Sequence, residues 1–123
     1  MKTILFVLND PAKVLDLLNA WRQVGASGAT VLFSTGMGRL HQSAALRDDL
    51  PLMPSLSDFY EQGEELSRTI FTVIRDDLVE PILAATETIV GDLNKPGTGI
   101  LIILPVDGVH GLIDYAKGAE KPD

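Results

Sequence analysis

The sequence contains no cysteine, and this absence removes several kinds of chemistry at once. Disulfide bonds, thiolate nucleophiles and sulfur-ligated metals all require a cysteine side chain. A chain that can form no disulfide suits a reducing compartment, so we expect a cytoplasmic protein.

Basic residues are also scarce, since 10 lysines and arginines stand against 17 aspartates and glutamates, a formal net charge of −7 at pH 7. Nucleic-acid binding generally needs a basic surface that releases counterions from the phosphate backbone. The charge therefore argues against a nucleic-acid partner. It is compatible with a single nucleotide, because backbone N–H groups and one or two cations can supply a local positive field.

The sequence has no long apolar run either. The apolar residues that follow Met1 stop at Asn9, which is too short for a membrane span or an export signal, so we expect no direct membrane insertion. The length of 123 residues, with 46% hydrophobic and 22% charged residues, indicates one globular domain over residues 1–123.

Four runs of apolar and β-branched residues predict strands at residues 3–8, 29–34, 68–74 and 100–104. In the first and last of these runs, both the odd and the even positions are apolar, which indicates strands with two apolar faces. The remaining segments carry two helical patterns, a connector at residues 91–99 and a charged end, residues 116–123, that we expect to fray.

The first helical pattern has Asp10 as a capping residue, Pro11 in the first turn and Gly25 as a stop. Its predicted buried stripe consists of Val14, Leu15, Leu17, Leu18 and Trp21.

The second pattern begins at Asp76 and Asp77, and the spacing of Asp77 and Glu80 predicts a capping box. Its predicted buried face consists of Leu78, Val79, Ile82, Leu83, Thr86, Ile89 and Val90.

This order of elements predicts an α+β, ferredoxin-like βαββαβ sandwich, with an antiparallel four-stranded sheet and two helices on one face. Two helices leave the second apolar face of the sheet bare. Side chains left wet there would forgo about 1.5–3 kcal/mol each, a sum comparable with the stability of a whole domain. We therefore expect that face to be buried against other copies, in a homo-oligomer with closed symmetry.

Residues 40–66 contain prolines and an acidic cluster, so no single regular element crosses them. A connection of this length in a compact domain is usually functional or flexible. Its apolar residues fit either a partner-binding loop or a flap over the core, and the sequence leaves both open. The partner-binding candidates are Leu52, Met53, Pro54, Phe59 and Tyr60.

The second strand runs into residues 34–39, which read STGMGR. The glycines allow the backbone to approach a ligand closely, and Arg39 adds a cation beside them. Glycines at such spacing also make ordinary turns, so the local sequence does not decide between a turn and a phosphate cradle.

Together these segments resemble the P-II signalling proteins of nitrogen regulation, and more closely their divergent P-II-like relatives. The resemblance covers nearly the whole chain and depends on the order and spacing of four segments. These are GASGATV at residues 25–31, GMGR at 36–39, DDLV at 76–79 and LPVD at 104–107.

The resemblance implies a non-enzymatic regulator, a trimer whose sheets line the inside and which binds an adenine nucleotide in each cleft between subunits. It implies that residues 40–66 control a target protein, a membrane transporter or an enzyme, and that no cofactor is needed beyond this effector. The connector residues Gly97, Thr98 and Gly99 would approach the phosphates from the neighbouring subunit. The other side of the cleft would consist of Val7, Thr30, Gly36, Met37, Gly38 and Arg39.

The chain departs from the family pattern where a triphosphate would be held. Ile100 stands where the family has a phosphate-binding lysine, no arginine follows Leu104, and Leu40 replaces the glutamine used around magnesium and 2-oxoglutarate. Each lost charge-assisted contact costs about 1.5–3 kcal/mol. We therefore expect a less charged adenine ligand, such as AMP or a cyclic nucleotide, in place of ATP and 2-oxoglutarate.

Three other functions are compatible with the sequence: an enzyme, a metal-binding trimer similar to the copper-tolerance fold group, and a protein that only assembles and binds a partner. The histidines and carboxylates match neither a Ser-His-Asp order nor a recognisable metal-ligand spacing, so we expect no catalytic or metal site. The residues that an enzyme would use are His41 with Asp48 or Asp49, and His110 with Asp107 or Asp114.

Overall fold

The computed structural model describes residues 1–36 and 67–113. The loop expected at residues 40–66 and the end expected to fray at 116–123 lie outside this part of the chain. The described elements are, in order, β1 (Lys2–Leu8), the 3-10 turn η1 (Pro11–Lys13), α1 (Val14–Val24), β2 (Thr30–Ser34), β3 (Ser67–Ile74), the 3-10 turn η2 (Asp76–Leu78), α4 (Val79–Val90) and β4 (Ile100–Pro105).

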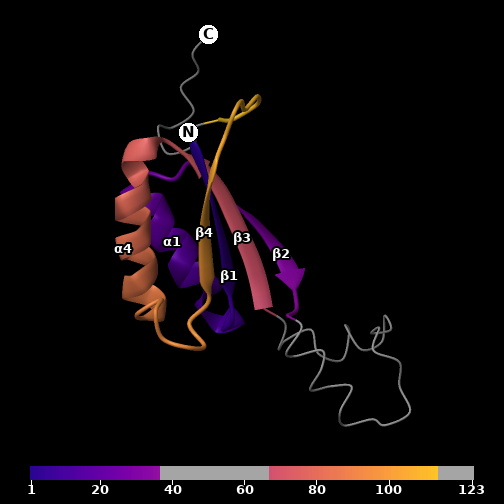
Figure 1. Ribbon diagram of the computed structural model, residues 1–123, viewed down its shortest axis with the longest axis vertical. Coiled ribbons are helices and arrows are strands. Elements are labelled where there is room, and N and C mark those ends of the chain that lie inside the picture. Colours follow the sequence, from indigo (N-terminus) through magenta and orange to yellow (C-terminus); the bar gives the residue numbers. More distant parts are fainter. Residues whose placement is uncertain (37–66, 114–123) are drawn as a thin grey trace, which may run out of the picture.

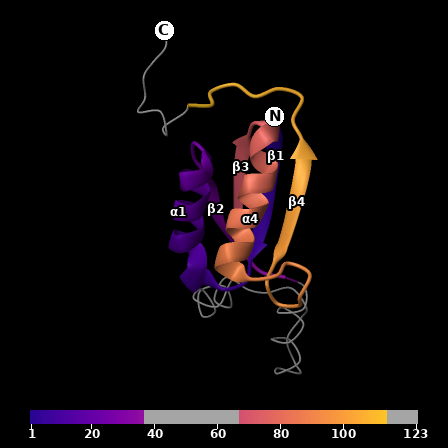
Figure 2. The ribbon, with the colours of Figure 1, turned by 90° about the vertical axis from the view of Figure 1, so that its left-hand side faces the viewer.

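The strands form one four-stranded sheet in the order β2-β3-β1-β4, and every neighbouring pair is antiparallel. Both helices lie side by side on the same face of this sheet (Figures 1 and 2). The predicted α+β architecture is therefore confirmed, and the arrangement is compatible with a ferredoxin-like fold. The strand order follows from two split βαβ units, because each crossover leaves room for one strand of the other unit.

The chain enters the first helix through the turn η1, at the residues that the sequence predicts. The Asp10 carboxylate accepts a hydrogen bond from the backbone N–H of Ala12 at 3.0 Å, and Pro11 is the first residue of η1. Lys13, which precedes α1, makes no capping bond through its side chain. Gly25 ends α1 with φ of 121°, a backbone conformation that side chains other than hydrogen rarely allow.

The buried stripe of α1 is narrower than predicted. Leu17 and Trp21 are buried, and Val14 and Leu18 pack against the core from its margin. Leu15 is 74% exposed, so its assignment to the buried stripe is wrong. Successive helical residues are about 100° apart around the axis, and this rotation turns Leu15 away from the side that faces the sheet.

The predicted capping box of the second helix is also wrong. The chain first makes the turn η2 and then enters α4. Arg75 is the residue before η2 and Leu78 is the residue before α4, and neither makes a capping hydrogen bond through its side chain. Asp77 lies inside that turn, and its carboxylate pairs with the guanidinium of Arg75 at 3.0 Å. The spacing of Asp77 and Glu80 was therefore not sufficient for a capping box, since the Asp77 carboxylate lies inside the turn and bonds to Arg75.

The core lies between the helices and the sheet. Alternate residues of β1 and β3 point toward the helices, and register places Phe6 opposite Ile70. Thr86 and Ile82 form the most buried part of α4, and Leu78, Val79, Ile89 and Val90 flank them. The fully enclosed hydrophobic side chains are Ile4, Phe6, Leu8, Leu17, Ile70 and Ile82.

One buried hydrogen bond joins the two helices. The indole N–H of Trp21 donates to Oγ1 of Thr86 at 2.9 Å, and that hydroxyl donates to the backbone oxygen of Ile82 at 2.7 Å. Trp21 is 1% exposed and Thr86 is 0% exposed. The bond satisfies the indole N–H without water, and this allows a tryptophan to fill the space between the helices and the sheet.

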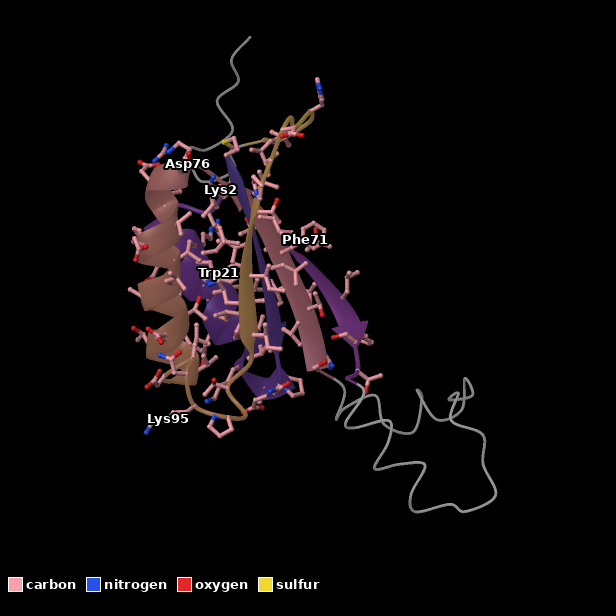
Figure 3. The ribbon with its side chains drawn as sticks, viewed as in Figure 1. Lys2, Trp21, Phe71, Asp76 and Lys95 are labelled. Atoms are coloured by element: carbon pink, nitrogen blue, oxygen red, sulfur yellow. The ribbon has the colours of Figure 1, made fainter. Side chains whose placement is uncertain are left out.

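The sheet face opposite the helices is apolar, and we call it the open face. Register places Leu5 opposite Phe71 on one side and Ile102 on the other. Figure 3 shows Trp21 on the helix side of the sheet and Phe71 on the open face. At one end of this face, residues 111–113 line a cavity together with Phe71 and Val73. Its apolar members are Leu5, Val7, Leu32, Phe71, Val73, Ile100, Ile102 and Leu104.

Replacing Thr86 by valine tests the bond between the helices. Thr86→Val keeps the side-chain shape but leaves the Trp21 indole N–H buried and unpaired, so we expect a loss of about 1–3 kcal/mol in the free energy of unfolding. Urea denaturation followed by the fluorescence of Trp21, the single tryptophan of the chain, measures it at a fixed protein concentration.

The matched control is Thr88→Val on the same helix. Thr88 makes the same kind of bond, to the backbone oxygen of Ala84 at 3.0 Å, but on the exposed side. We expect a change within about 0.5 kcal/mol. Equal losses for the two variants would contradict a specific role for the buried bond.

Candidate functional site

The candidate ligand residues lie at two different ends of the sheet. β1 and β2 end where β3 and β4 begin, and we call this the connector end. Val7, Gly36 and residues 97–99 lie there, whereas Thr30 lies at the opposite end, where β2 begins. Met37, Gly38, Arg39 and the five partner-binding candidates between Leu52 and Tyr60 are outside the described residues.

The connector from α4 to β4 packs closely on β1. A Cβ at Gly99 would lie 2.4 Å from the backbone oxygen of Val7 and 2.8 Å from the ring of Phe6, and the φ of Gly99 is 130°. The amide of Asn9 donates to the backbone oxygen of Gly97 at 3.3 Å. Only glycine allows this approach, so Gly99 determines where the connector runs.

This packing makes Val7 and the connector neighbours within one chain. The resemblance places them on opposite sides of a cleft between copies, and that division of the site stays a prediction.

The connector also carries a cation that the sequence reasoning passed over. Lys95 lies four residues before Gly99, and Figure 3 shows it at the outer edge of the connector, below α4. Its backbone N–H bonds to the oxygen of Asp92 at 3.0 Å, and its backbone oxygen accepts from the Thr98 hydroxyl at 2.9 Å. Lys95 precedes the connector glycines, whereas the family pattern has its lysine after them. A search of the sequence for a lysine after the glycines therefore misses Lys95.

At the other corner of the connector end, hydroxyl groups join β2 to β3. The Ser34 hydroxyl bonds to the Ser67 hydroxyl at 2.9 Å, and Ser67 Oγ also donates to the backbone oxygen of Ser34 at 3.0 Å. Thr69 Oγ1 donates to Ser34 Oγ at 2.9 Å. We call these residues the hydroxyl ring. It fixes the strand ends just before Gly36, and no local sequence pattern predicts it.

On the helix side of the same corner, the guanidinium of Arg68 stacks over the ring of Phe33 at 4.2 Å from its centroid. Phe33 is 71% exposed, because the helices do not extend over the edge strand β2. Stacking of this kind contributes about 0.5–1 kcal/mol at exposed sites. It holds the ends of β2 and β3 together from the face opposite the hydroxyl ring.

A cavity of about 210 Å³ lies at the end of the sheet where Thr30 is found. Ser27, Gly28 and Thr30 bring backbone and hydroxyl groups to it, and Phe71 and residues 111–113 form apolar walls. The Thr72 hydroxyl donates to the backbone oxygen of Gly28 and so holds the segment that contains Gly28 against β3. Sites for whole ligands usually measure about 300–1,000 Å³, so this cavity suits one flat, mostly apolar part of a ligand.

The two ends are separated by the length of β2. Strand residues rise about 3.3 Å each, which puts Thr30 about 13 Å from Ser34 along the strand. Gly36 follows the edge strand β2, whereas the connector leads into the other edge strand, β4, and packs on the central strand β1. A single chain therefore offers separate parts of a ligand site, and the described residues do not enclose a whole nucleotide.

A scan against protein-family models and a search of curated proteins returned no match to this chain. The geometry of the chain itself therefore carries the functional argument.

The histidines and carboxylates of the described residues form no metal-binding group. No group of three or more His, Asp or Glu side chains within residues 1–36 and 67–113 could hold a metal ion. Asp107 and His110 lie in the exposed segment after β4, while His41, Asp48, Asp49 and Asp114 lie outside the described residues. Neither described helix is long and apolar enough to cross a membrane.

The clearest electrostatic perturbation lies at the end of the sheet where β1 and β2 begin. The Met1 amino group bonds to the Asp76 carboxylate at 3.0 Å. This hydrogen bond, together with the positive charges of the amino group and of Lys2, lowers the pKa of Asp76. Figure 3 shows Lys2 and Asp76 near the start of the helix that follows β3. The pair joins β1 to that turn, and neither Met1 nor Asp76 lines the cavity beside Thr30.

Substitution of Gly99 tests the packing of the connector. In Gly99→Ala the new methyl group clashes with β1 and the backbone is strained, so we expect a loss of about 2–4 kcal/mol in the free energy of unfolding. Urea denaturation measures the loss.

Two other glycines serve as controls. Gly97→Ala, with φ of 85° and no atom within 4 Å, should show strain alone, about 1 kcal/mol. Gly108→Ala has neither strain nor a neighbour within 4 Å and should change stability by less than about 0.5 kcal/mol. If Gly99→Ala lost no more than Gly97→Ala, the connector would not pack on β1 as described.

Proposed function

We propose that this chain is a P-II-like regulatory protein: a non-enzymatic homotrimer that binds an adenine nucleotide between copies and controls a partner through residues 40–66. The observation that carries the proposal is the open face, an apolar sheet surface with candidate ligand residues at its two ends. The resemblance at residues 25–31, 36–39, 76–79 and 104–107 supplies the family.

The open face supports assembly through burial of apolar surface. Ile100 is 62% exposed, Leu32 is 50% exposed, and Ile102 and Leu104 are 41% and 43% exposed. Complete burial of such a side chain contributes about 1.5–3 kcal/mol. Large contiguous apolar patches on a soluble domain usually mark interaction sites, and a closed ring of copies covers such a face on every member.

Cyclic assembly also explains why the ligand site is divided. In a ring of three, each interface joins two different patches of neighbouring copies. The cavity beside Thr30 of one copy then meets Gly36 and the connector of the next. We propose that the cavity takes the adenine and that the glycines of the connector end approach the phosphate through their backbone N–H groups.

The charges favour a ligand with few phosphates. Ile100, which follows the connector directly, is apolar and exposed, and its neighbour Gly99 offers only backbone groups. Lys95 and the predicted contact Arg39 are the cations nearest to the glycines in sequence. Two cations balance a monophosphate better than a triphosphate, so AMP or a cyclic nucleotide fits the proposal best.

Regulation is assigned to residues 40–66 because the hydroxyl ring joins the end of β2, which precedes this segment, to the start of β3, which follows it, next to the proposed phosphate site. A ligand held there would act on the base of the loop. The target, a membrane transporter or an enzyme of the cytoplasm, follows from the resemblance alone. Leu52, Met53, Pro54, Phe59 and Tyr60 stay the predicted contacts for that partner.

The assembly is tested with one substitution on the open face. Wild-type protein should have three times the mass of the chain by light scattering after size exclusion. Ile102→Asp places an unpaired carboxylate in the interface and should give monomers, because a buried charge without a partner costs several kcal/mol.

The matched control is Leu15→Asp, whose position is 74% exposed on the helix side, and it should stay trimeric. A monomeric wild type would overturn the proposed assembly. If Ile102→Asp were still trimeric, the interface between copies would have to be a surface other than the open face.

The ligand is tested by thermal unfolding with AMP, cyclic AMP, ADP and ATP, with UMP as the pyrimidine control. Binding to the folded protein adds about 2.7 kcal/mol of stability at a hundredfold excess over Kd. We expect the largest rise in melting temperature with AMP or cyclic AMP, and a smaller rise with UMP.

A variant that fills the cavity makes this test specific. Gly28→Leu has no atom within 4 Å of the new Cβ and lines the cavity, so it should fold, assemble and lose the response. Gly108→Leu, which is equally unhindered but away from the cavity, should keep it. A trimer that responds to no nucleotide would favour the function of assembly and partner binding alone.

A further inference from the structure

Thr35, the first residue after β2, has a hydroxyl oxygen that is buried and has no hydrogen-bond partner. Within residues 1–36 and 67–113, no other buried side-chain nitrogen or oxygen is left in this state. An unpaired buried hydroxyl disfavours folding by about tenfold or more in the folding equilibrium. Such a group needs an explanation, because native proteins satisfy nearly all of them.

The neighbouring hydroxyls do not supply the missing partner. Ser34, Ser67 and Thr69 bond to one another in the hydroxyl ring, and Ser67 also donates to the backbone oxygen of Ser34. Adjacent positions on the same strand end thus differ: Ser34 is fully engaged by the fold, and Thr35 is not. A valine at position 35 would have the same shape without the unsatisfied oxygen, so the fold alone gives the hydroxyl no role.

The backbone next to Thr35 has room on one side. A Cβ built on Gly36 would meet no atom within 4 Å. Gly36 is also the first of the glycines expected to approach a phosphate. An acceptor oxygen bound beside Gly36 would lie next to Thr35 in the chain, and the Thr35 hydroxyl, which is buried in the empty protein, would turn toward it.

We infer that the Thr35 hydroxyl donates a hydrogen bond to a phosphate oxygen of the bound nucleotide. This inference depends on the proposed function, and it adds a specific side-chain contact to a site otherwise built from backbone groups and cations. A hydroxyl that stays unpaired in the empty protein and is paired in the complex contributes its whole bond to affinity. The unpaired hydroxyl destabilises the empty protein, and the hydrogen bond to the ligand removes this destabilisation.

The test compares Thr35→Val, which removes the hydroxyl and keeps the shape, with Thr35→Ser, which keeps the hydroxyl. Without ligand, Thr35→Val should melt at the same temperature as wild type or higher. Titration calorimetry with AMP, cyclic AMP, ADP and ATP should then give Kd values about tenfold higher for Thr35→Val and near the wild-type values for Thr35→Ser.

Thr69→Val is the matched control from the hydroxyl ring. Its hydroxyl is engaged by Ser34 at 2.9 Å, so this variant should melt several degrees below wild type without ligand. Opposite effects of the two threonine-to-valine changes on the empty protein would support an unsatisfied hydroxyl at Thr35 and a satisfied one at Thr69.

Three outcomes separate the inference from the proposed function. If Thr35→Val melts as far below wild type as Thr69→Val does, the hydroxyl has a partner within the chain and the inference is overturned. If Thr35→Val is stable and binds the nucleotides as wild type does, the hydroxyl is no ligand contact, and the proposed function stands. If wild type binds none of the four nucleotides, the inference and the proposed ligand fail together.

Discussion

Two helices can cover only one face of a four-stranded sheet. In this sheet β1, β3 and β4 each have at least two apolar residues on both faces, and only β2 does not. The central strands β1 and β3 are well enclosed beneath the helices, with Ile4, Phe6 and Ile70 at 0% exposure. The edge strands extend beyond the helices, so Ile103 and Phe33 stay 41% and 71% exposed even on the covered side. Unburied apolar surface is therefore concentrated at the open face and the two edges, where another copy can reach it.

The sequence predicted the elements well because its signals there are local. Strands began and ended within about two residues of the predicted positions, since each apolar run is bounded by turn residues. Asp10 lies directly before the turn η1 and accepts the N–H of Ala12, whereas Asp77 lies inside the turn η2 and pairs with Arg75. Leu15 was wrongly assigned to the buried stripe of α1 because the sequence does not show how much of the helix circumference packs against the sheet.

The site was less predictable because it depends on register between distant segments. The separation of Thr30 from Gly36 was readable in principle, since both flank one short strand and so lie at its two ends. The contact of Gly99 with Val7 joins residues about ninety positions apart in sequence, and the hydroxyl ring joins β2 to a strand that follows a long intervening segment. No spacing rule reaches across such distances, because only the pairing of the strands brings these groups together.

A ligand site divided between two ends of a sheet links binding to assembly. If the base lies in the cavity of one copy and the phosphate at the connector end of the next, a separated chain offers only half of the contacts. The ligand then stabilises the assembled form by mass action, and assembly in turn raises the affinity for the ligand by the same free energy. The hydroxyl ring stands where such coupling reaches the loop, because it fixes both of the loop's strand ends whether or not a ligand is present. Changes on binding would therefore begin beyond Ser34, at Thr35 and the glycines that follow it.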